Sequence, residues 1–295
     1  MPKGRIIKAL SGFYYVSIGS DVYECKLRGV LKREEGLPLV GDFVEVSIVD
    51  EQEKEGVIEK VEPRTSSLLR PPIANVTKAL LIFGVKDPRP NLSLIDRFIV
   101  HAEKESLEVV LCFNKIDLDQ ENFHPRLVQI YRRAGYKVLT ISAKDGRGIE
   151  EIRKELRGHV TVVAGPSGVG KTSVINALDE RLNLRTSHIS AKLGRGRHTT
   201  RYASLIDIGE GSLVADTPGF SSLSLEQVEE TELKEYFIEF HEYDHDCRFG
   251  FKCLHEKEPG CRVRQAEEEG EIAKERYQSY LQLLGEVREA HRRKY

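Results

Sequence analysis

The chain has 295 residues, of which 40% are hydrophobic and 31% charged, and its net charge is −2. This length favours two or three domains, and the composition fits a soluble protein with a well-formed core. No apolar run approaches the ~20 residues of a membrane-spanning helix, and the N-terminus lacks the apolar stretch of a signal peptide, so we expect no membrane partner.

The cysteines point to a reducing, cytoplasmic compartment. Five is an odd number, which fits a disulfide framework poorly. Cys25 and Cys112 lie in apolar, strand-like runs, and we expect them in the core. The other three gather near the C-terminus, where they are considered with a neighbouring histidine below.

The first part of the chain reads as short strands separated by turn signals. Strands are predicted over residues 5–10, 12–18, 22–27, 42–49 and 57–61. This pattern predicts a small closed barrel of the OB-fold type, which we assign to residues 1–72 as an RNA-binding domain. Residues 63–72 then act as a linker, because the Arg70-Pro71-Pro72 run disfavours a helix.

Overall charge does not mark an RNA-binding face on this barrel, because residues 1–74 hold 11 Lys/Arg and 12 Asp/Glu and are not basic overall. Aromatic and basic side chains can form a stacking and phosphate-contact face, or the aromatic rings can fill the barrel. The candidates are Tyr14, Tyr15, Tyr23, Arg28, Lys32 and Arg33. Of these, Arg28 and Lys32 are the predicted RNA contacts.

Residues 73–222 alternate between apolar strands and helices. Strands are predicted over residues 78–85, 107–113, 137–141, 159–164, 203–208 and 212–216, and helices over 92–105, 124–134, 148–156 and 171–178. Continuous apolar strands alternating with helices indicate a mostly parallel α/β sheet covered on both faces.

Two motifs in this segment can read a guanine base, and each follows a predicted strand. The first is Asn114, Lys115, Ile116 and Asp117, and the second is Ser142, Ala143 and Lys144. Asp117 can accept hydrogen bonds from N1–H and the exocyclic amine, a donor pair that adenine lacks. Asn114 can bond the base edge and tie loops together, and a backbone N–H of the second motif can reach O6. The pair therefore indicates GTP rather than ATP.

A phosphate-binding loop follows in the context it requires, after a strand and before a helix. It consists of Gly165, Pro166, Ser167, Gly168, Val169, Gly170, Lys171 and Thr172, with Ser173 next. Backbone N–H groups and the helix N-terminus form an anion cradle. Lys171 should reach the β- and γ-phosphates, and the Thr172 hydroxyl should ligate Mg²⁺.

The switch elements are expected after this loop. No acid occurs from Arg181 to Ile206, a basic stretch that favours a polyanion partner over a merely solvated face. Within it, Arg195 and Arg197 are predicted RNA contacts. Thr199 or Thr200 is the candidate for sensing Mg²⁺ and the γ-phosphate.

Asp216-Thr217-Pro218-Gly219 ends another apolar strand. Asp216 suits a direct or second-sphere Mg²⁺ role, and the Gly219 N–H can meet the γ-phosphate. Phe220 stands where a Ras-type enzyme has its water-orienting glutamine, and its ring cannot activate water. We therefore predict slow intrinsic hydrolysis, with His198 or an external group completing a catalytic set that includes Lys171 and Thr200.

The order of these motifs is unusual, since the base-reading motifs precede the phosphate loop. An ordinary GTPase has the opposite order, so the sequence predicts a circular permutation. As a consequence, the chain leaves the GTPase domain just after the loop that senses the γ-phosphate.

The C-terminal segment, residues 223–295, is predicted to be a helical zinc-binding domain. Cys247, Cys253, His255 and Cys261 supply three thiolates and an imidazole, which suits one tetrahedral, structural Zn²⁺. His241 and His245 are competing ligands, and unrelated reduced cysteines are the alternative. Helices are predicted over residues 224–240 and from 263 onward. The apolar face of the last helix is expected to pack against the body of the protein.

Together these residues resemble the RsgA family, also called YjeQ, of circularly permuted GTPases that depend on the small ribosomal subunit. The resemblance covers the whole chain and includes residues 165–173, 194–200 and 216–220, Glu258-Pro259-Gly260-Cys261, and Arg276-Tyr277-Gln278-Ser279-Tyr280. It implies late maturation of the small subunit, with GTP hydrolysis stimulated by that subunit. One departure is the spacing of five residues between the first two cysteines, where the family pattern has four.

The predicted function is a GTP hydrolase, acting as a monomer, whose nucleotide state times its binding to small-subunit rRNA. A non-enzymatic RNA-binding assembly chaperone, with GTP as a structural ligand, is the alternative that Phe220 keeps open. A GTPase acting on a protein or membrane partner is disfavoured by the basic switch region and the lack of a membrane segment.

Overall fold

The computed structural model describes residues 1–29, 37–69, 72–179, 182, 204–215 and 223–293. They form two compact units, each assembled from segments that are distant in sequence. The first holds the described residues of 1–78, 153–163 and 178–221, and the second those of 79–152, 164–177 and 222–295.

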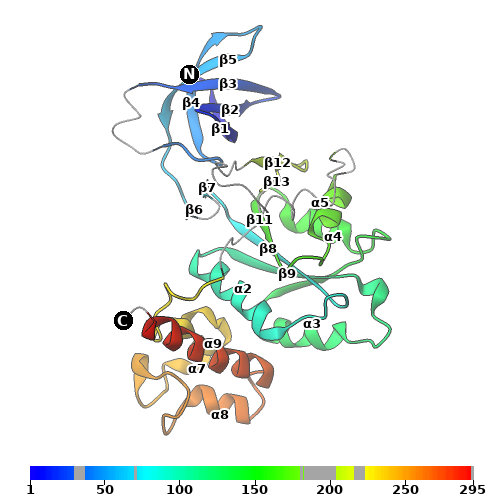
Figure 1. Ribbon diagram of the computed structural model, residues 1–295, viewed down its shortest axis with the longest axis vertical. Helices are drawn as coiled ribbons and strands as arrows, with labels where there is room; N and C mark the ends of the chain where they lie inside the picture. The colour runs from blue at the N-terminus through cyan, green and yellow to red at the C-terminus, as the bar shows by residue number, and fades with distance from the viewer. Residues whose placement is uncertain (30–36, 70–71, 180–181, 183–203, 216–222, 294–295) are drawn as a thin grey trace. The chain divides into compact units, whose positions relative to one another are not determined.

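The first unit contains a closed five-stranded barrel with strand order β1-β2-β3-β5-β4 (Figure 1). Its strands are β1 (Lys3–Leu10), β2 (Phe13–Ile18), β3 (Asp21–Leu27), β4 (Phe43–Asp50) and β5 (Glu55–Val61). Strands β3 and β5 pair in parallel, and the other neighbours are antiparallel. Alternate residues point inward and are fully buried, including Ile6, Val16, Cys25, Val44, Val46 and Ile58. The predicted OB-type barrel is confirmed.

The structure shows whether two aromatic residues of the barrel fill its core or form a stacking face. Tyr14 and Tyr23 are only 7% and 3% exposed, so their rings fill the core instead of forming a stacking face. Tyr15 lies outside, with Lys8 Nζ 5.1 Å from its ring centroid. Arg28 is exposed and forms an ion pair with Glu59. Lys32 and Arg33 lie outside the described residues.

The described residues of the segment predicted as a linker pack against the barrel's own residues. It forms an antiparallel ribbon of β6 (Ser67–Leu69) and β7 (Pro72–Ala74). The buried Asp42 accepts hydrogen bonds from Arg64 Nε (2.7 Å) and Leu39 N (2.7 Å). The Asn75 amide donates to the carbonyl of Gly41 at 3.0 Å. These contacts satisfy buried polar groups, which explains why this Pro-containing stretch is not a free connection.

The middle of the chain alternates between strand and helix as predicted. Its elements are β8 (Lys78–Gly84), α2 (Leu92–Lys104), β9 (Glu108–Asn114), α3 (His124–Arg133), β10 (Lys137–Thr140), α4 (Ile149–Leu156), β11 (Val160–Ala164), α5 (Lys171–Leu178), β12 (Leu205–Asp207) and β13 (Leu213–Ala215). In the second unit the strand order is β10-β9-β8, and β10 is parallel to β9. In the first unit the order is β11-β13-β12, with β13 parallel to β11. Strand β8 is buried along its whole length, as expected for a strand covered on both faces.

The C-terminal segment differs from the prediction at its start. The helix expected over residues 224–240 is wrong: turns lead into the 3₁₀ helices η3 (Leu233–Tyr236) and η4 (Ile238–Phe240). The buried positions Val228 and Leu233 are five residues apart, which breaks the 3.6-residue period of an amphipathic α-helix. The short helix α7 (His241–Asp244) and the 3₁₀ turn η5 (Gly250–Lys252) follow.

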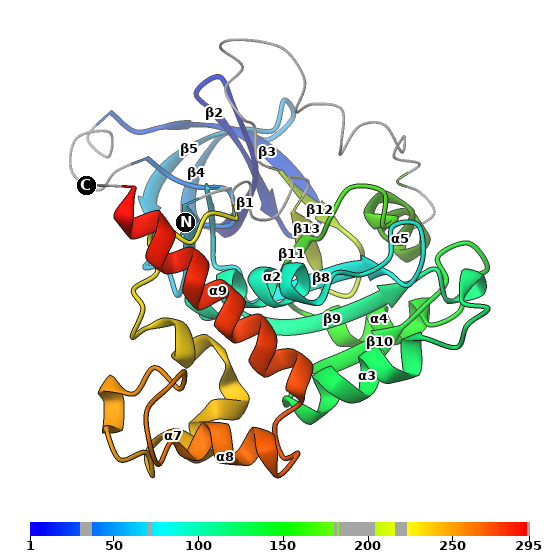
Figure 2. The same cartoon turned by 60° about the horizontal axis from the view of Figure 1, so that its bottom comes forward.

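The last predicted helix is two helices, α8 (Arg262–Glu268) and α9 (Lys274–Arg292), separated at Gly270, whose φ is 76°. The buried face of α9 includes Tyr277, Tyr280, Leu283, Leu284 and Val287. These side chains share one apolar cluster with Val100 of α2. Figures 1 and 2 show α9, in red, lying alongside α2, so the predicted packing of this helix against the body is confirmed. Among the described helices, none combines the length and apolar character of a membrane-spanning segment.

Candidate functional site

The phosphate loop connects β11 to α5 and requires glycine at its first position. Gly165 has φ 143°, and a Cβ there would lie 2.0 Å from the carbonyl oxygen of Ile82. The Lys171 ammonium folds back over the loop and donates to the carbonyl oxygens of Gly165 (2.8 Å) and Pro166 (2.6 Å). Burial lowers the pKa of Lys171. An arriving phosphate can take the place of these carbonyl oxygens, because the ammonium is already held above the loop.

Asn114, the last residue of β9, joins the three nucleotide loops. Its side chain is buried, and Nδ2 donates to the carbonyl of Val169 in the phosphate loop at 2.9 Å. Its Oδ1 accepts from the backbone N–H of Lys115 (2.8 Å) and of Ala143 (3.1 Å). A Cβ at Gly170 would lie 2.5 Å from Nδ2, so the loop can approach Asn114 only with glycine at this position. One side chain thus sets the spacing between the phosphate loop and both base-reading loops.

Asp117 lies in the 3₁₀ helix η1 (Ile116–Leu118), which begins after Lys115 in the left-handed conformation, at φ 67°. Its Oδ1 accepts a hydrogen bond from the hydroxyl of Ser142, a fully buried residue, at 2.7 Å. This contact between the two base-reading loops had no signal in the sequence. A carboxylate has about four acceptor positions, so Asp117 retains the capacity to bind both guanine donors.

This geometry predicts a change of base specificity in an Asp117→Asn variant. The amide can accept from Ser142 and donate to the carbonyl at C2 of xanthine, but it loses the second acceptor that guanine needs. We expect GTP binding to weaken by at least about tenfold, because one charge-assisted hydrogen bond of about 1.5–3 kcal/mol is lost. We also expect XTP to bind more tightly. Calorimetric titration with both nucleotides measures this, and unchanged affinities would refute the assignment of the base pocket.

Several predicted site residues lie outside the described residues, namely Lys32, Arg195, Arg197, His198, Thr200, Asp216 and Gly219. Of the others, Arg28 belongs to the first unit and the rest to the second. Thr172 is buried in the first turn of α5, and Lys144 is exposed beside Asp145. The Lys115 ammonium donates to the carbonyl oxygen of Asp87.

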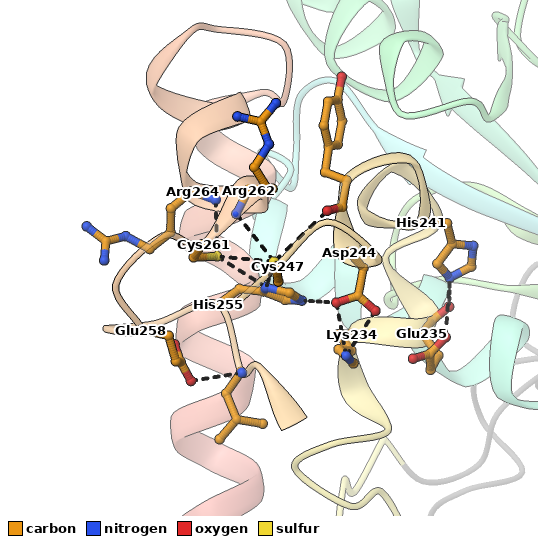
Figure 3. Close-up of polar contacts among 12 residues, drawn as sticks. Lys234, Glu235, His241, Asp244, Cys247, His255, Glu258, Cys261, Arg262 and Arg264 are labelled. Atoms are coloured by element: carbon orange, nitrogen blue, oxygen red, sulfur yellow. Dashed lines mark hydrogen bonds and ion pairs between the residues drawn. The ribbon is translucent and has the colours of Figure 1, made fainter. Parts of the chain in front are cut away.

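The four predicted metal ligands converge into one buried cluster. Figure 3 shows three of them, Cys247, His255 and Cys261. The candidate donor atoms of Cys247, Cys253, His255 and Cys261 all lie within 4.8 Å of one another. His255 Nδ1 is 3.7 Å from Cys247 Sγ and 3.3 Å from Cys261 Sγ. His241 and His245 are exposed and lie outside this cluster.

The protonation of these side chains follows from their burial. Burial raises the pKa of the Cys253 thiol to about 12 and lowers the pKa of His255 to about 4. The imidazole is therefore neutral and can donate its lone pair, whereas the Cys253 thiol needs a cation to become a thiolate. Backbone N–H groups of Arg262 and Arg264 point at Cys247 Sγ (3.3 Å) and Cys261 Sγ (3.5 Å). The residues present fit a metal ion.

The shell around the cluster was not anticipated from the sequence. His255 Nε2 lies 3.0 Å from Asp244 Oδ1, and the buried Lys234 ammonium holds both oxygens of Asp244 at 3.0 and 2.9 Å. A carboxylate at the second nitrogen of a ligating histidine fixes its ring and tautomer. The hydroxyls of Tyr277 and Tyr280 donate to the carbonyls of His255 (2.6 Å) and Leu254 (2.7 Å), which fastens the cluster to α9.

Comparisons with known proteins agree with this geometry. Residues 3–58 match the family model described as the RsgA N-terminal domain, and residues 61–226 match that of the RsgA GTPase. A protein of Alkaliphilus metalliredigens, named small ribosomal subunit biogenesis GTPase RsgA, is 45% identical over 99% of this chain and 100% of its own length. A protein of the same name from Caldanaerobacter subterraneus is 44% identical over 99% and 98%.

Two solved structures resemble the whole chain. YjeQ from Thermotoga maritima is 37% identical, with a TM-score of 0.85 over 97% of this chain and 98% of that one. YloQ, described as a circularly permuted GTPase, is 38% identical, with a TM-score of 0.82 over 98% and 96%.

The fold and the site therefore define a circularly permuted GTPase with an N-terminal OB-type barrel and a C-terminal segment that carries a Cys₃His cluster. The chain belongs to the RsgA GTPase family, which confirms the resemblance seen in the sequence. Because it is a GTPase, the non-enzymatic alternative is set aside.

Proposed function

We propose that this GTPase acts in late maturation of the small ribosomal subunit and binds its rRNA in a nucleotide-dependent way. The observation that carries the proposal is that Asn114 hydrogen-bonds both the phosphate loop and the second base-reading loop. These bonds build a guanine-nucleotide site from loops in permuted order. The relatives are named for biogenesis of the small ribosomal subunit, and this name supplies the proposed target. Monomeric action in the cytoplasm, testable by light scattering and fractionation, completes the proposal.

The nucleotide dependence would arise at the exit from the GTPase segment. Gly219 is proposed to bind the γ-phosphate, so hydrolysis would release the start of the C-terminal segment, residues 223–295. RNA contacts are proposed for Arg28 and Lys32 in residues 1–72, and for Arg195 and Arg197 in the acid-free stretch. Affinity for small subunits in GTP-analogue and GDP states should differ by roughly 5- to 150-fold, a typical coupling between two sites.

For the metals, we propose one structural Zn²⁺ at the Cys₃His cluster and Mg²⁺ with GTP. The donor set and its burial support zinc. The Thr172 hydroxyl and Asp216 would hold Mg²⁺, whose charge would offset that of the phosphates. Lys171 and Thr200 would contact the transferred phosphate, and His198 would orient the attacking water that Phe220 cannot orient.

The deciding experiment is GTP hydrolysis titrated separately with small subunits, large subunits and free RNA. We expect stimulation by small subunits alone, and His198→Ala should lower the stimulated rate while sparing GTP affinity. General acid–base assistance typically contributes about 10²–10⁴-fold. Equal stimulation by both subunits would refute the proposed target. Full stimulation in the His198 variant would assign water positioning to a ribosomal group.

A further inference from the structure

A short loop in the C-terminal segment exposes two aromatic rings. Phe249 is 46% exposed and Phe251 is 76% exposed, and both lie between the metal-ligand candidates Cys247 and Cys253. Large apolar rings in water are unfavourable, and clustered ones mark binding surfaces more often than scattered ones do. The loop between Cys247 and Cys253 therefore has the character of a contact surface.

The charges of the same loop point to the kind of partner. Arg248 and Lys252 flank the two rings, and no acidic residue stands between Cys247 and Cys253. Neither cation forms an ion pair with any residue that the structure describes, and Lys252 Nζ lies 5.9 Å from the centroid of Phe251. Unpaired cations beside aromatic rings suit single-stranded nucleic acid, whose bases stack and whose phosphates attract cations. A purely apolar pocket on a protein would leave the two charges without partners.

The loop is also held in shape before any partner arrives. Gly250 N donates to the Cys247 carbonyl at 2.9 Å, and Cys253 N donates to the Gly250 carbonyl at 2.9 Å. Both ends are candidate metal ligands, so a bound ion would close the loop a second time. Figure 2 shows the segment between α7 and α8, in orange, at the outer edge of the second unit, away from β9 and β10. A preorganised, protruding loop loses little conformational entropy on binding.

We propose that residues 248–252 form an RNA-contacting loop, in which Phe249 and Phe251 stack on unpaired bases of the small subunit and Arg248 and Lys252 contact phosphates. The inference rests on the proposed function and adds to it a second contact surface, distinct from the switch region. It also gives the metal a structural role, since the ion would fix the loop that carries Phe249 and Phe251.

The test compares Phe249→Ala and Phe251→Ala with Phe→Leu changes at the same positions, measuring affinity for purified small subunits. Each lost stack should weaken binding by about 5- to 150-fold, and leucine should not restore it, because it is apolar but cannot stack on a base. Metal content and GTP affinity should stay at wild-type values in all variants. Arg248→Gln should lower the slope of log affinity against log salt by about 1.

A Phe251→Trp variant adds a direct readout, since the chain contains no tryptophan. Stacking on bases should quench the new fluorescence when small subunits are added, with affinity retained. A blue-shifted increase in emission, or affinity retained by the leucine variants, would show an apolar protein pocket and overturn the proposal. Alanine variants that bind as wild type would also overturn it. Failure of the wild-type protein to bind small subunits would instead refute the proposed function itself.

Discussion

An Arg276→Ala change is expected to destabilise the second unit by about 3–5 kcal/mol, the usual cost of removing one partner from a buried ion pair. Arg276 is 1% exposed and lies between two acids. Its Nη1 donates to Asp96 Oδ1 at 2.6 Å, and its Nε and Nη2 donate to the two oxygens of Glu239 at 2.7 and 2.9 Å. Alanine would leave both carboxylates in a low-dielectric site without a cation.

The groups around Arg276, Asp96 and Glu239 keep these three charges away from water. The guanidinium lies 4.5 Å from the centroid of Phe237, and the Tyr131 hydroxyl donates to Asp96 Oδ1 at 2.9 Å. Burial alone would lower the pKa of Arg276, but the charges of Asp96 and Glu239 hold this pKa well above its usual value. The guanidinium therefore stays charged at any pH at which the protein folds, and we expect no pH dependence from this group.

The measurement is urea unfolding of the metal-loaded full chain, followed by circular dichroism. Arg293→Ala is the matched control, because Arg293 is 82% exposed in its pair with Glu289 and should change stability by less than about 1 kcal/mol. Arg276→Lys should fall between the two, since lysine keeps the charge but not the planar fork. An alanine variant as stable as the control would contradict the assigned role of the network.

The motifs and the apolar patterns of the sequence predicted the barrel, the strand–helix alternation and the four metal-ligand candidates. These features depend on local spacing, which a single sequence records directly. The prediction of a helix over residues 224–240 was wrong. Helix propensity does not reveal that the spacing of apolar residues between Val228 and Leu233 breaks the helical period.

What the sequence did not reveal depends on tertiary contacts. Arg276 stands beside the apolar positions Tyr277 and Tyr280 on α9, but its partners come from α2 and η4, far away in sequence. Likewise, Asp244 meets His255, and Lys234 meets Asp244, only after folding. A charged residue on an otherwise apolar helix face was the one available signal, and it identifies a buried ion but not its partners.

The structure links these features into one chain of contacts inside the second unit. The loop with Phe249 and Phe251 is anchored at Cys247 and Cys253, and the cluster is fastened to α9 by two tyrosine hydroxyls. Arg276 then fastens α9 to α2. Buried, hydrogen-bonded contacts therefore join the proposed RNA-contacting loop to α2.

Removing the metal is expected to have the second large effect. The purified protein should carry about one Zn²⁺ per chain, and Cys261→Ala should lose it. Free energies of zinc binding in small zinc modules are about 10–16 kcal/mol, which is folding free energy when no site exists in the unfolded chain. We expect residues 241–261 to lose hydrogen-exchange protection in this variant, and in the wild type after chelation.

The effect should remain local, because Phe237, Phe240 and Tyr280, which share an apolar cluster with the three sulfurs, are unchanged in the variant. GTP affinity should change little, since Asn114 is bonded to the phosphate loop and Asp117 to Ser142, and neither hydrogen bond involves the cluster. Cys25→Ala is the matched control: it removes a buried sulfur from the barrel and should keep the zinc. Mass spectrometry for bound metal and hydrogen exchange for order separate the two variants. Wild-type protection of residues 241–261 in a metal-free Cys261 variant would mean that apolar packing, and not the ion, holds the loop that we propose contacts RNA.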